Sequence, residues 1–263
     1  MVNKLCARRT AGNSFIIATI VLLLATTTVD GAAPPLDAAA ILSRCDEAEG
    51  YQSSYSEIQQ DITTSSGDVR TLEIRGWAVN NGEKQLSEYL SPADIRGQKI
   101  LITNDGDDIW MFNPETRRTR KLGSHMKKRK VMGSDFSYED MAGGKMSEKY
   151  KGSLIGEEEQ EGTLCYILDL KPTPKGPSYS KIKIWIGKED FLSRRIDFFQ
   201  NNETEPFKRL TCTDIRKADD KLYPHTFTMT NLEDRTKTVD SIKSLRFGID
   251  IPPSIFESRN LSR

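Results

Sequence analysis

The feature that most constrains this chain is a regular alternation of strand-like runs with short turns. Residues 181–186 show it clearly, because Ile182, Ile184 and Ile186 alternate with Lys or Trp and so form one apolar face. The turns, such as Glu161-Gly162 and Asn201-Asn202, use residues that hairpins of two to five residues favour. Strand-like runs recur at 150–157, 163–170, 181–187, 191–200, 206–215, 221–231 and 236–247. The chain is therefore predicted to form a large antiparallel sheet.

Such a sheet of about ten strands does not lie flat, because neighbouring strands twist by roughly 20° and large sheets curl. Residues 191–199 are apolar on both faces, which requires a cover on each side. One helix is predicted after Asp37, with Ala38, Ile41, Leu42, Cys45 and Ala48 at helical spacing before Gly50. The pattern allows a closed barrel or an incompletely closed one with an apolar concave side.

Residues 1–31 have the organisation of an export signal. Lys4, Arg8 and Arg9 precede an apolar core at 15–25, and small residues surround the expected cleavage after Gly31. The core is shorter than the about 20 residues of a membrane span, and no Cys directly follows it to carry a lipid. We expect residues 32–263 to be one exported domain.

Charge and motifs exclude several functions. Without Asp30 and the leader's three basic residues, the chain has 35 basic and 37 acidic residues, a balance that does not suggest nucleic acid. His125 and His225 lie far apart, and the motifs of zinc proteases, serine hydrolases and phosphate-binding loops are missing. We therefore expect no enzyme, no metal and no cofactor.

The expected mature chain contains Cys45, Cys165 and Cys212, an odd number in an oxidising compartment. Cys165 and Cys212 both lie in strand-like runs. They are either buried small apolar residues or partners in a disulfide, and the sequence leaves both open.

Residues 100–141 contain the most distinctive motifs. A hairpin turn at Asn104–Asp107 leads to a strand in which Trp110 and Phe112 share one face, and Asn113-Pro114 ends that strand. A basic run follows, and then Met-Gly-Ser-Asp-Phe-Ser-Tyr-Glu-Asp at 132–140, where Ser137 and Asp140 are spaced to cap a short helical turn.

These motifs resemble the bacterial outer-membrane lipoprotein-sorting protein family, a LolA-like group. Other matching segments are residues 90–97, 179–186 and 251–259, so the resemblance runs from about Leu36 to the C-terminus. It implies a mainly β (α+β) fold, an unclosed half-barrel in which the N-terminal helix and short helices form a lid. In related proteins the cavity under the lid accepts acyl chains.

Two sets of site residues follow. The apolar set, expected to line the ligand cavity, is Trp110, Phe112, Phe136, Tyr138, Met141 and Ile184. The basic run holds eight positive residues in 117–130 and is either a solvated loop or a contact for anionic headgroups or an acidic partner. The residues expected to make that contact are Lys127, Lys128, Arg129 and Lys130.

The sequence thus favours a periplasmic carrier that shields lipoprotein acyl chains or a free lipid. The resemblance implies an inner-membrane lipid exporter as donor and an outer-membrane acceptor. One alternative is a LolA-like sensing or interaction module of an envelope-stress or transporter complex. A second is an envelope hydrolase.

Overall fold

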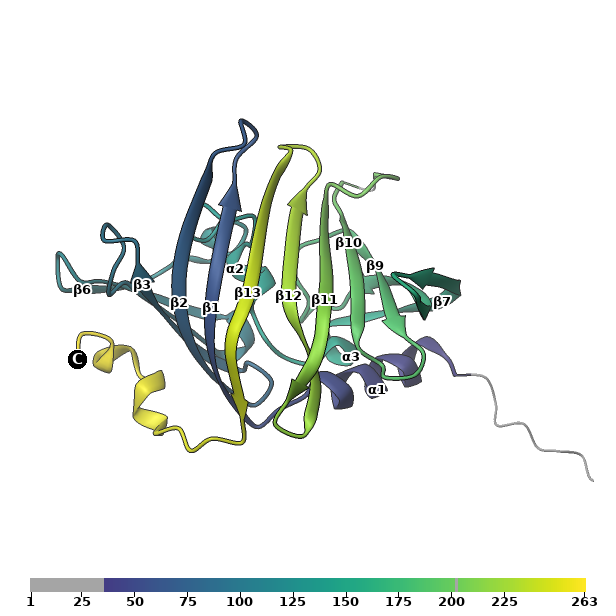
Figure 1. Ribbon diagram of the computed structural model, residues 1–263, viewed down its shortest axis with the longest axis horizontal. Coiled ribbons are helices and arrows are strands. Elements are labelled where there is room, and N and C mark those ends of the chain that lie inside the picture. The colour runs from purple at the N-terminus through teal and green to yellow at the C-terminus, as the bar shows by residue number, and fades with distance from the viewer. Residues whose placement is uncertain (1–35, 202) are drawn as a thin grey trace, which may run out of the picture. The chain divides into compact units, whose positions relative to one another are not determined.

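A single 13-stranded antiparallel sheet dominates the part of the chain that the structure describes (Figure 1). The structure is a computed structural model and describes residues 36–201 and 203–263. Residues 36–263 form one compact unit, while the predicted signal and its cleavage after Gly31 lie outside the described residues. The strands are β1 (Ser53–Thr63), β2 (Val69–Val79), β3 (Lys84–Ser91), β4 (Lys99–Thr103), β5 (Asp108–Asn113), β6 (Arg118–Lys121), β7 (Tyr150–Gln160), β8 (Thr163–Pro172), β9 (Lys181–Gly187), β10 (Ser193–Phe199), β11 (Lys208–Ala218), β12 (Lys221–Asn231) and β13 (Thr236–Phe247).

The helices are few and short. Helix α1 begins after Asp37, whose Oδ1 accepts a hydrogen bond of 2.8 Å from the Ala40 amide, and Gly50 follows its end, as predicted. The helices and 3₁₀ turns are α1 (Ala38–Glu49), η1 (Asn104–Gly106), η2 (Ser124–Met126), α2 (Tyr138–Met141), α3 (Met146–Lys149), η3 (Pro253–Phe256) and η4 (Ser258–Asn260).

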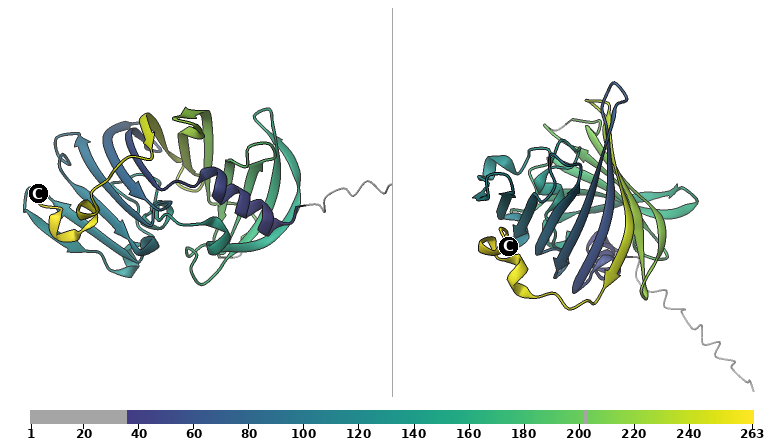
Figure 2. Two further views of the ribbon diagram at one scale, coloured as in Figure 1. Left: turned by 90° about the horizontal axis from the view of Figure 1, so that it is seen from below. Right: turned by 60° about the vertical axis from the view of Figure 1, so that its left-hand side comes forward.

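The strand order leaves the sheet open. It runs β6-β5-β4-β3-β2-β1-β13-β12-β11-β10-β9-β8-β7, so β6 and β7 are the two edges, and the pairing of β1 with β13 joins the two ends of the domain. The sheet curves strongly, as Figure 2 shows. The closed barrel that the sequence allowed is therefore excluded in favour of the half-barrel.

Strand register assigns the side chains to faces. Ile62 lies opposite Thr238, and Thr238 lies opposite Met229, so these three residues point to the same side of the sheet. Met229 belongs to a buried cluster with α1, and Ile62 belongs to a second cluster with Tyr138 of α2. Helices α1 and α2 therefore cover the same face of the sheet, which is the concave face (Figure 2).

The convex face has its own apolar cluster near β3, β4 and β5. Leu86, Leu101 and Phe112 pack there with Phe256 and Leu261 of the C-terminal segment. The yellow C-terminal segment in Figure 1 lies over these strands, on the side opposite α2 and α3. The apolar convex side of this half of the sheet is thus covered by the end of the chain.

The predicted strands at 181–187, 221–231 and 236–247 agree with β9, β12 and β13. The basic run differs from the expected loop, because residues 118–121 form the edge strand β6 against β5. Alternation of charged residues with Thr119 suits an edge strand, where both faces and one edge meet water.

Candidate functional site

The candidate site is the concave face of the half-barrel, which two covers close. The first, the helix cover, is α1. It packs Ile41, Leu42 and Cys45, each at most 2% exposed, against inward-facing residues of β8 and β9 that include Ile184. Ile184, one of the residues expected to line the ligand cavity, therefore lies fully buried beneath α1.

The second, the loop cover, is the segment 122–149 between β6 and β7. Its capping box is confirmed, since the Ser137 side chain accepts from the Asp140 amide while the Asp140 carboxylate accepts from the Ser137 amide. This cap turns Tyr138 and Met141 onto the cluster of β1 to β5, and Phe136 packs against the cluster under α1. The loop aromatics thus fill the space beneath the loop cover in this conformation.

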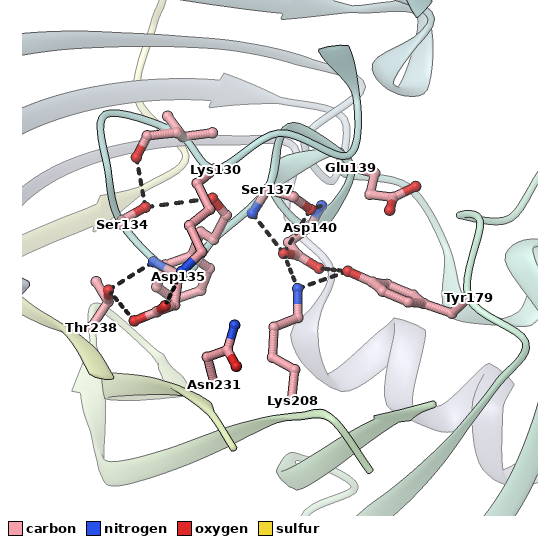
Figure 3. A network of polar contacts seen from close by, with 12 residues as sticks. Lys130, Ser134, Asp135, Ser137, Glu139, Asp140, Tyr179, Lys208, Asn231 and Thr238 are labelled. Carbon is pink, nitrogen blue, oxygen red and sulfur yellow. Dashed lines mark hydrogen bonds and ion pairs between the residues drawn. The ribbon is translucent and has the colours of Figure 1, made fainter. Parts of the chain in front are cut away.

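A buried ion pair holds the loop cover down at α2. Lys208 of β11 donates to Asp140 Oδ2 over 2.6 Å, and the two side chains are 5% and 4% exposed (Figure 3). The Tyr179 hydroxyl donates to the other Asp140 oxygen over 2.5 Å and accepts from Lys208 over 2.8 Å. Burial, followed by the charge of Asp140, raises the pKa of Tyr179. This triad, Asp140, Tyr179 and Lys208, is named the latch below.

A second set of polar contacts holds the loop cover on β13. The amide of Asp135 donates to Thr238 Oγ1 over 2.8 Å, and Thr238 and Thr236 hydroxyls donate to its carboxylate over 3.0 and 2.5 Å. Lys130 adds an ion pair of 3.0 Å to Asp135 (Figure 3) and another of 3.0 Å to Asp234. Because these groups are hydrogen-bonded rather than packed by apolar contact alone, water can replace them when the cover opens.

Between the two covers, the concave face keeps a row of partly exposed side chains, here named the central strip: Tyr51, Tyr223, Phe227, Asp240 and Phe247. Ring centroids are separated by 5.6 Å for Tyr51 and Phe247, 5.5 Å for Phe247 and Tyr223, and 6.1 Å for Tyr223 and Phe227. Burial raises the pKa of both tyrosines. The strip is therefore an aromatic surface with one carboxyl group, able to contact an apolar ligand.

A polar groove of about 1060 Å³ runs beside the loop cover and reaches the central strip at Tyr51. Both signs of charge line it, among them Asp105, Lys127, Lys128 and Lys149. Lys149 donates to the carbonyls of Ala142 and Gly143, and burial lowers its pKa. The mouth of the concave face is thus lined by groups that can contact a polar or charged ligand end.

The expected basic contact residues have two different environments. Lys127 pairs with Asp107 over 2.8 Å, and Lys130 is engaged by Asp135 and Asp234. Lys128 and Arg129 are exposed and form no ion pair with the residues that the structure describes. Lys128 and Arg129 are therefore the residues of this group that remain free to meet a partner.

The structure does not bring the six expected apolar residues together. Phe136, Tyr138, Met141 and Ile184 face the concave side, divided between the clusters of the two covers. Trp110 and Phe112 share one face as predicted, but it is the convex face, where both belong to the cluster with the C-terminal segment. The alternation of side chains along the strand predicted that these two residues share a face, but it could not predict whether that face is concave or convex.

The central strip was missed by the sequence analysis. Tyr223 and Phe227 follow the period of two that also places His225 and Met229 on the inner face of β12, and this alternation was the available signal. Asp240 gave no signal, because a polar residue within a strand is normally assigned to the solvent face.

The described part of the chain bears on the expectations for metal ligands, a disulfide and a membrane-spanning helix. Within residues 36–201 and 203–263, no group of three or more His, Cys, Asp or Glu side chains is placed to hold a metal ion. Cys45, Cys165 and Cys212 are buried free thiols, so the possible Cys165–Cys212 disulfide is not formed. No helix in the same ranges is long and apolar enough to cross a membrane.

An open half-barrel with a covered concave face defines the fold class of this protein, and comparison with known proteins identifies the family. A family model described as an uncharacterized protein matches residues 81–263. A search of curated proteins finds no match. The chain belongs to this family, and its fold is LolA-like.

Solved structures support this assignment. An outer membrane lipoprotein-sorting protein domain from Vibrio parahaemolyticus is similar with 24% identity and a TM-score of 0.78, covering 86% of this chain and 98% of that one. A DUF1329 family protein from Desulfovibrio piger has 26% identity and a TM-score of 0.78, covering 85% and 97%. A LolA superfamily protein from Nitrosomonas europaea has 19% identity and a TM-score of 0.71, covering 84% and 98%.

Proposed function

We propose that this protein is a periplasmic carrier that shields the acyl chains of a lipoprotein or a free lipid on its concave face. The observation that supports this proposal most is the pair of unequal covers over an apolar surface. The loop cover inserts Phe136, Tyr138 and Met141 where acyl chains would lie, and buried ion pairs and hydrogen bonds add to this apolar packing in holding it in place.

In the proposed cycle the loop cover lifts, its apolar side chains leave the concave face, and the ligand's chain replaces them. Each buried methylene contributes about 0.8 kcal/mol, so a few partly buried chains bind tightly. The latch contributes to the cost of opening, since the ion pair of Asp140 with Lys208 must break when the cover lifts, and hydration of the two charges offsets only part of that loss. Release then requires an acceptor that binds the ligand more tightly.

The expected donor is an inner-membrane lipid exporter, and the expected acceptor lies at the outer membrane. Lys128 and Arg129, next to the groove, suit contact with anionic headgroups or an acidic partner. The proposed carrier performs no catalysis, so lipid recovered after incubation with the protein is chemically unchanged.

The test is uptake of an apolar fluorescent probe, together with native mass spectrometry and lipid extraction of protein purified from its own envelope. Lys208→Met removes the cation of the latch and is expected to raise probe affinity about tenfold, because the open state becomes more populated. Arg209→Met is the matched control, since Arg209 is the next residue, points to the convex face and pairs with Asp197.

The proposal fails if the native protein carries no lipid or lipoprotein and neither it nor Lys208→Met takes up the probe. Capture of a regulatory protein without lipid would instead support a sensing module. Lipid that is recovered cleaved would support an envelope hydrolase.

A further inference from the structure

A polar pair lies in the floor of the concave face. Gln60 of β1 and Asp240 of β13 are directly opposite each other, and Gln60 Nε2 donates to Asp240 Oδ1 over 2.8 Å. Gln60 is only 6% exposed, whereas Asp240 remains partly exposed on the central strip. The pair therefore lies at the bottom of the concave face, with one member reachable from the strip.

The pair of Gln60 and Asp240 has hydrogen-bond acceptors that receive no donor. Gln60 Oε1 is buried and has no hydrogen-bond partner. The bond from Gln60 is the one hydrogen bond that the described residues donate to the Asp240 side chain. Turning the Gln60 amide round would place its oxygen against Asp240 and leave its N–H groups unpaired, so neither orientation satisfies the amide. A buried polar atom without a partner costs free energy that a suitable ligand group would recover.

The surroundings supply no cation. Leu72 lies opposite Gln60, and Phe227 lies opposite Asp240. Burial raises the pKa of the Tyr89 hydroxyl, and the charges of Tyr138 and Asp240 raise it further. Asp240 forms no ion pair within the described ranges, and burial raises its pKa to about 7. The missing partner is a hydrogen-bond donor, and a positive charge on it would complement Asp240.

The pair also stands at one end of a continuous aromatic path. Phe227 is opposite Asp240, and from it the ring contacts lead through Tyr223 and Phe247 to Tyr51, where the polar groove begins. An elongated ligand could thus place its chain along the rings while its donor group meets the pair.

We infer that Gln60 and Asp240 form a polar subsite that selects amphiphiles whose polar end donates hydrogen bonds, as a primary ammonium or a hydroxyl group does. The inference rests on the proposed carrier function and specifies its ligand class. The donor group meets Gln60 Oε1 and the free Asp240 oxygen, and the aliphatic chain lies on the central strip. A ligand that ends in a carboxylate is disfavoured, because it brings only acceptors and a charge of the same sign as ionised Asp240.

The test uses four probes of equal chain length at pH 8: dodecylamine, dodecanol, dodecanoate and dodecane. Each competes with an apolar fluorescent probe for the wild-type protein and for the variants Asp240→Asn, Gln60→Leu and Asp61→Asn. Asp61 neighbours Gln60 on β1 but faces the convex side, where Gln59 and Thr71 donate to it. Its substitution therefore removes one negative charge while both side chains of the subsite stay in place, although the Asp61 charge also raises the pKa of Asp240.

The wild-type protein is expected to bind dodecylamine and dodecanol about tenfold more tightly than dodecanoate and dodecane. Asp240→Asn should weaken dodecylamine more than dodecanol, and Gln60→Leu should weaken both donors, while Asp61→Asn keeps the wild-type order.

Equal binding of all four probes by the wild-type protein overturns the inference and leaves the carrier proposal standing, as does a preference that survives in both Asp240→Asn and Gln60→Leu. Failure of every probe to bind wild-type protein overturns the carrier proposal itself. Circular dichroism of each variant at the assay temperature establishes that a lost preference does not come from unfolding.

Discussion

The two covers of the concave face are held by different forces. The helix cover buries Ile41, Leu42 and Cys45 in a dry cluster, so its removal would expose apolar surface directly to water. The loop cover contributes fewer fully buried apolar side chains, Val131 and Tyr138 against four in α1, together with several partly buried ones. It is also anchored by Asp140 and Asp135 through ion pairs and hydrogen bonds. The helix cover is therefore part of the stable domain, whereas the loop cover can open locally.

The largest expected effect tests the helix cover. Ile41→Ala leaves a cavity in the cluster beneath α1, because Ile41 is fully buried, and should lower the free energy of unfolding by about 3 kcal/mol. Denaturant unfolding measures the change. Ser43→Ala, on the exposed side of the same helix, should change stability by less than about 0.5 kcal/mol. If Ile41→Ala lowers the free energy of unfolding by less than about 1 kcal/mol, packing of α1 contributes no more to stability than the loop cover does.

The next effect tests the latch. Lys208→Met leaves Asp140 buried without its cation, which should cost about 2 kcal/mol, less than full burial of a lone charge because the loop cover can open to water. Hydrogen exchange should accelerate for the amides of residues 137–141 and stay unchanged in α1. Equal acceleration in both covers would contradict the distinction between them, and Arg209→Met provides the control.

A smaller effect concerns Asp240, which lies between the covers. Burial raises its pKa from the ordinary 3.8 to about 7, so the folded protein binds the proton more tightly than the unfolded chain does. Its contribution to stability is full below about pH 4 and is lost as pH rises through 7. Asp240→Asn should therefore gain about 1 kcal/mol over wild type between pH 4 and pH 8, allowing for partial exposure. Chemical denaturation at both pH values measures it, and an unchanged difference would contradict the raised pKa.

The smallest effect on stability concerns the outer surface of the loop cover. The double variant Lys128→Glu/Arg129→Glu should change the free energy of unfolding by less than about 0.5 kcal/mol, since both side chains are exposed and without ion pairs to the described residues. Binding to anionic vesicles should weaken about tenfold at low salt. Lys217→Glu/Lys237→Glu, with the same change in charge on exposed residues of β11 and β13, is the control. Equal weakening by both double variants would mean that net charge, rather than this surface, governs binding.

The sequence predicted much of the local structure because local structure depends on neighbours in the chain. The helix that follows Asp37, the capping box of Ser137 with Asp140, and the bounds of β9, β12 and β13 all follow from spacing and turn chemistry. The family's half-barrel was also correctly expected.

The site itself depends on contacts between distant segments. Gln60 and Asp240 are 180 residues apart, Asp135 and Thr238 are 103 apart, and Asp140 and Lys208 are 68 apart. Alternation along β5 could not tell that Trp110 faces the convex side, because a period of two is the same for either side of a sheet. Only the register between strands separates the two faces.

The two free edges of the sheet carry opposite charges. Strand β6 bears Arg118, Arg120 and Lys121, while β7 bears Glu157, Glu158 and Glu159, and Figure 1 places these strands at opposite ends of the long axis. The two edges therefore present clusters of opposite charge. Near an anionic surface, the β6 end is attracted and the β7 end is repelled, and the resulting torque turns the protein before contact. A neutral chain overall thus approaches such a surface in a preferred orientation, with the β6 edge leading.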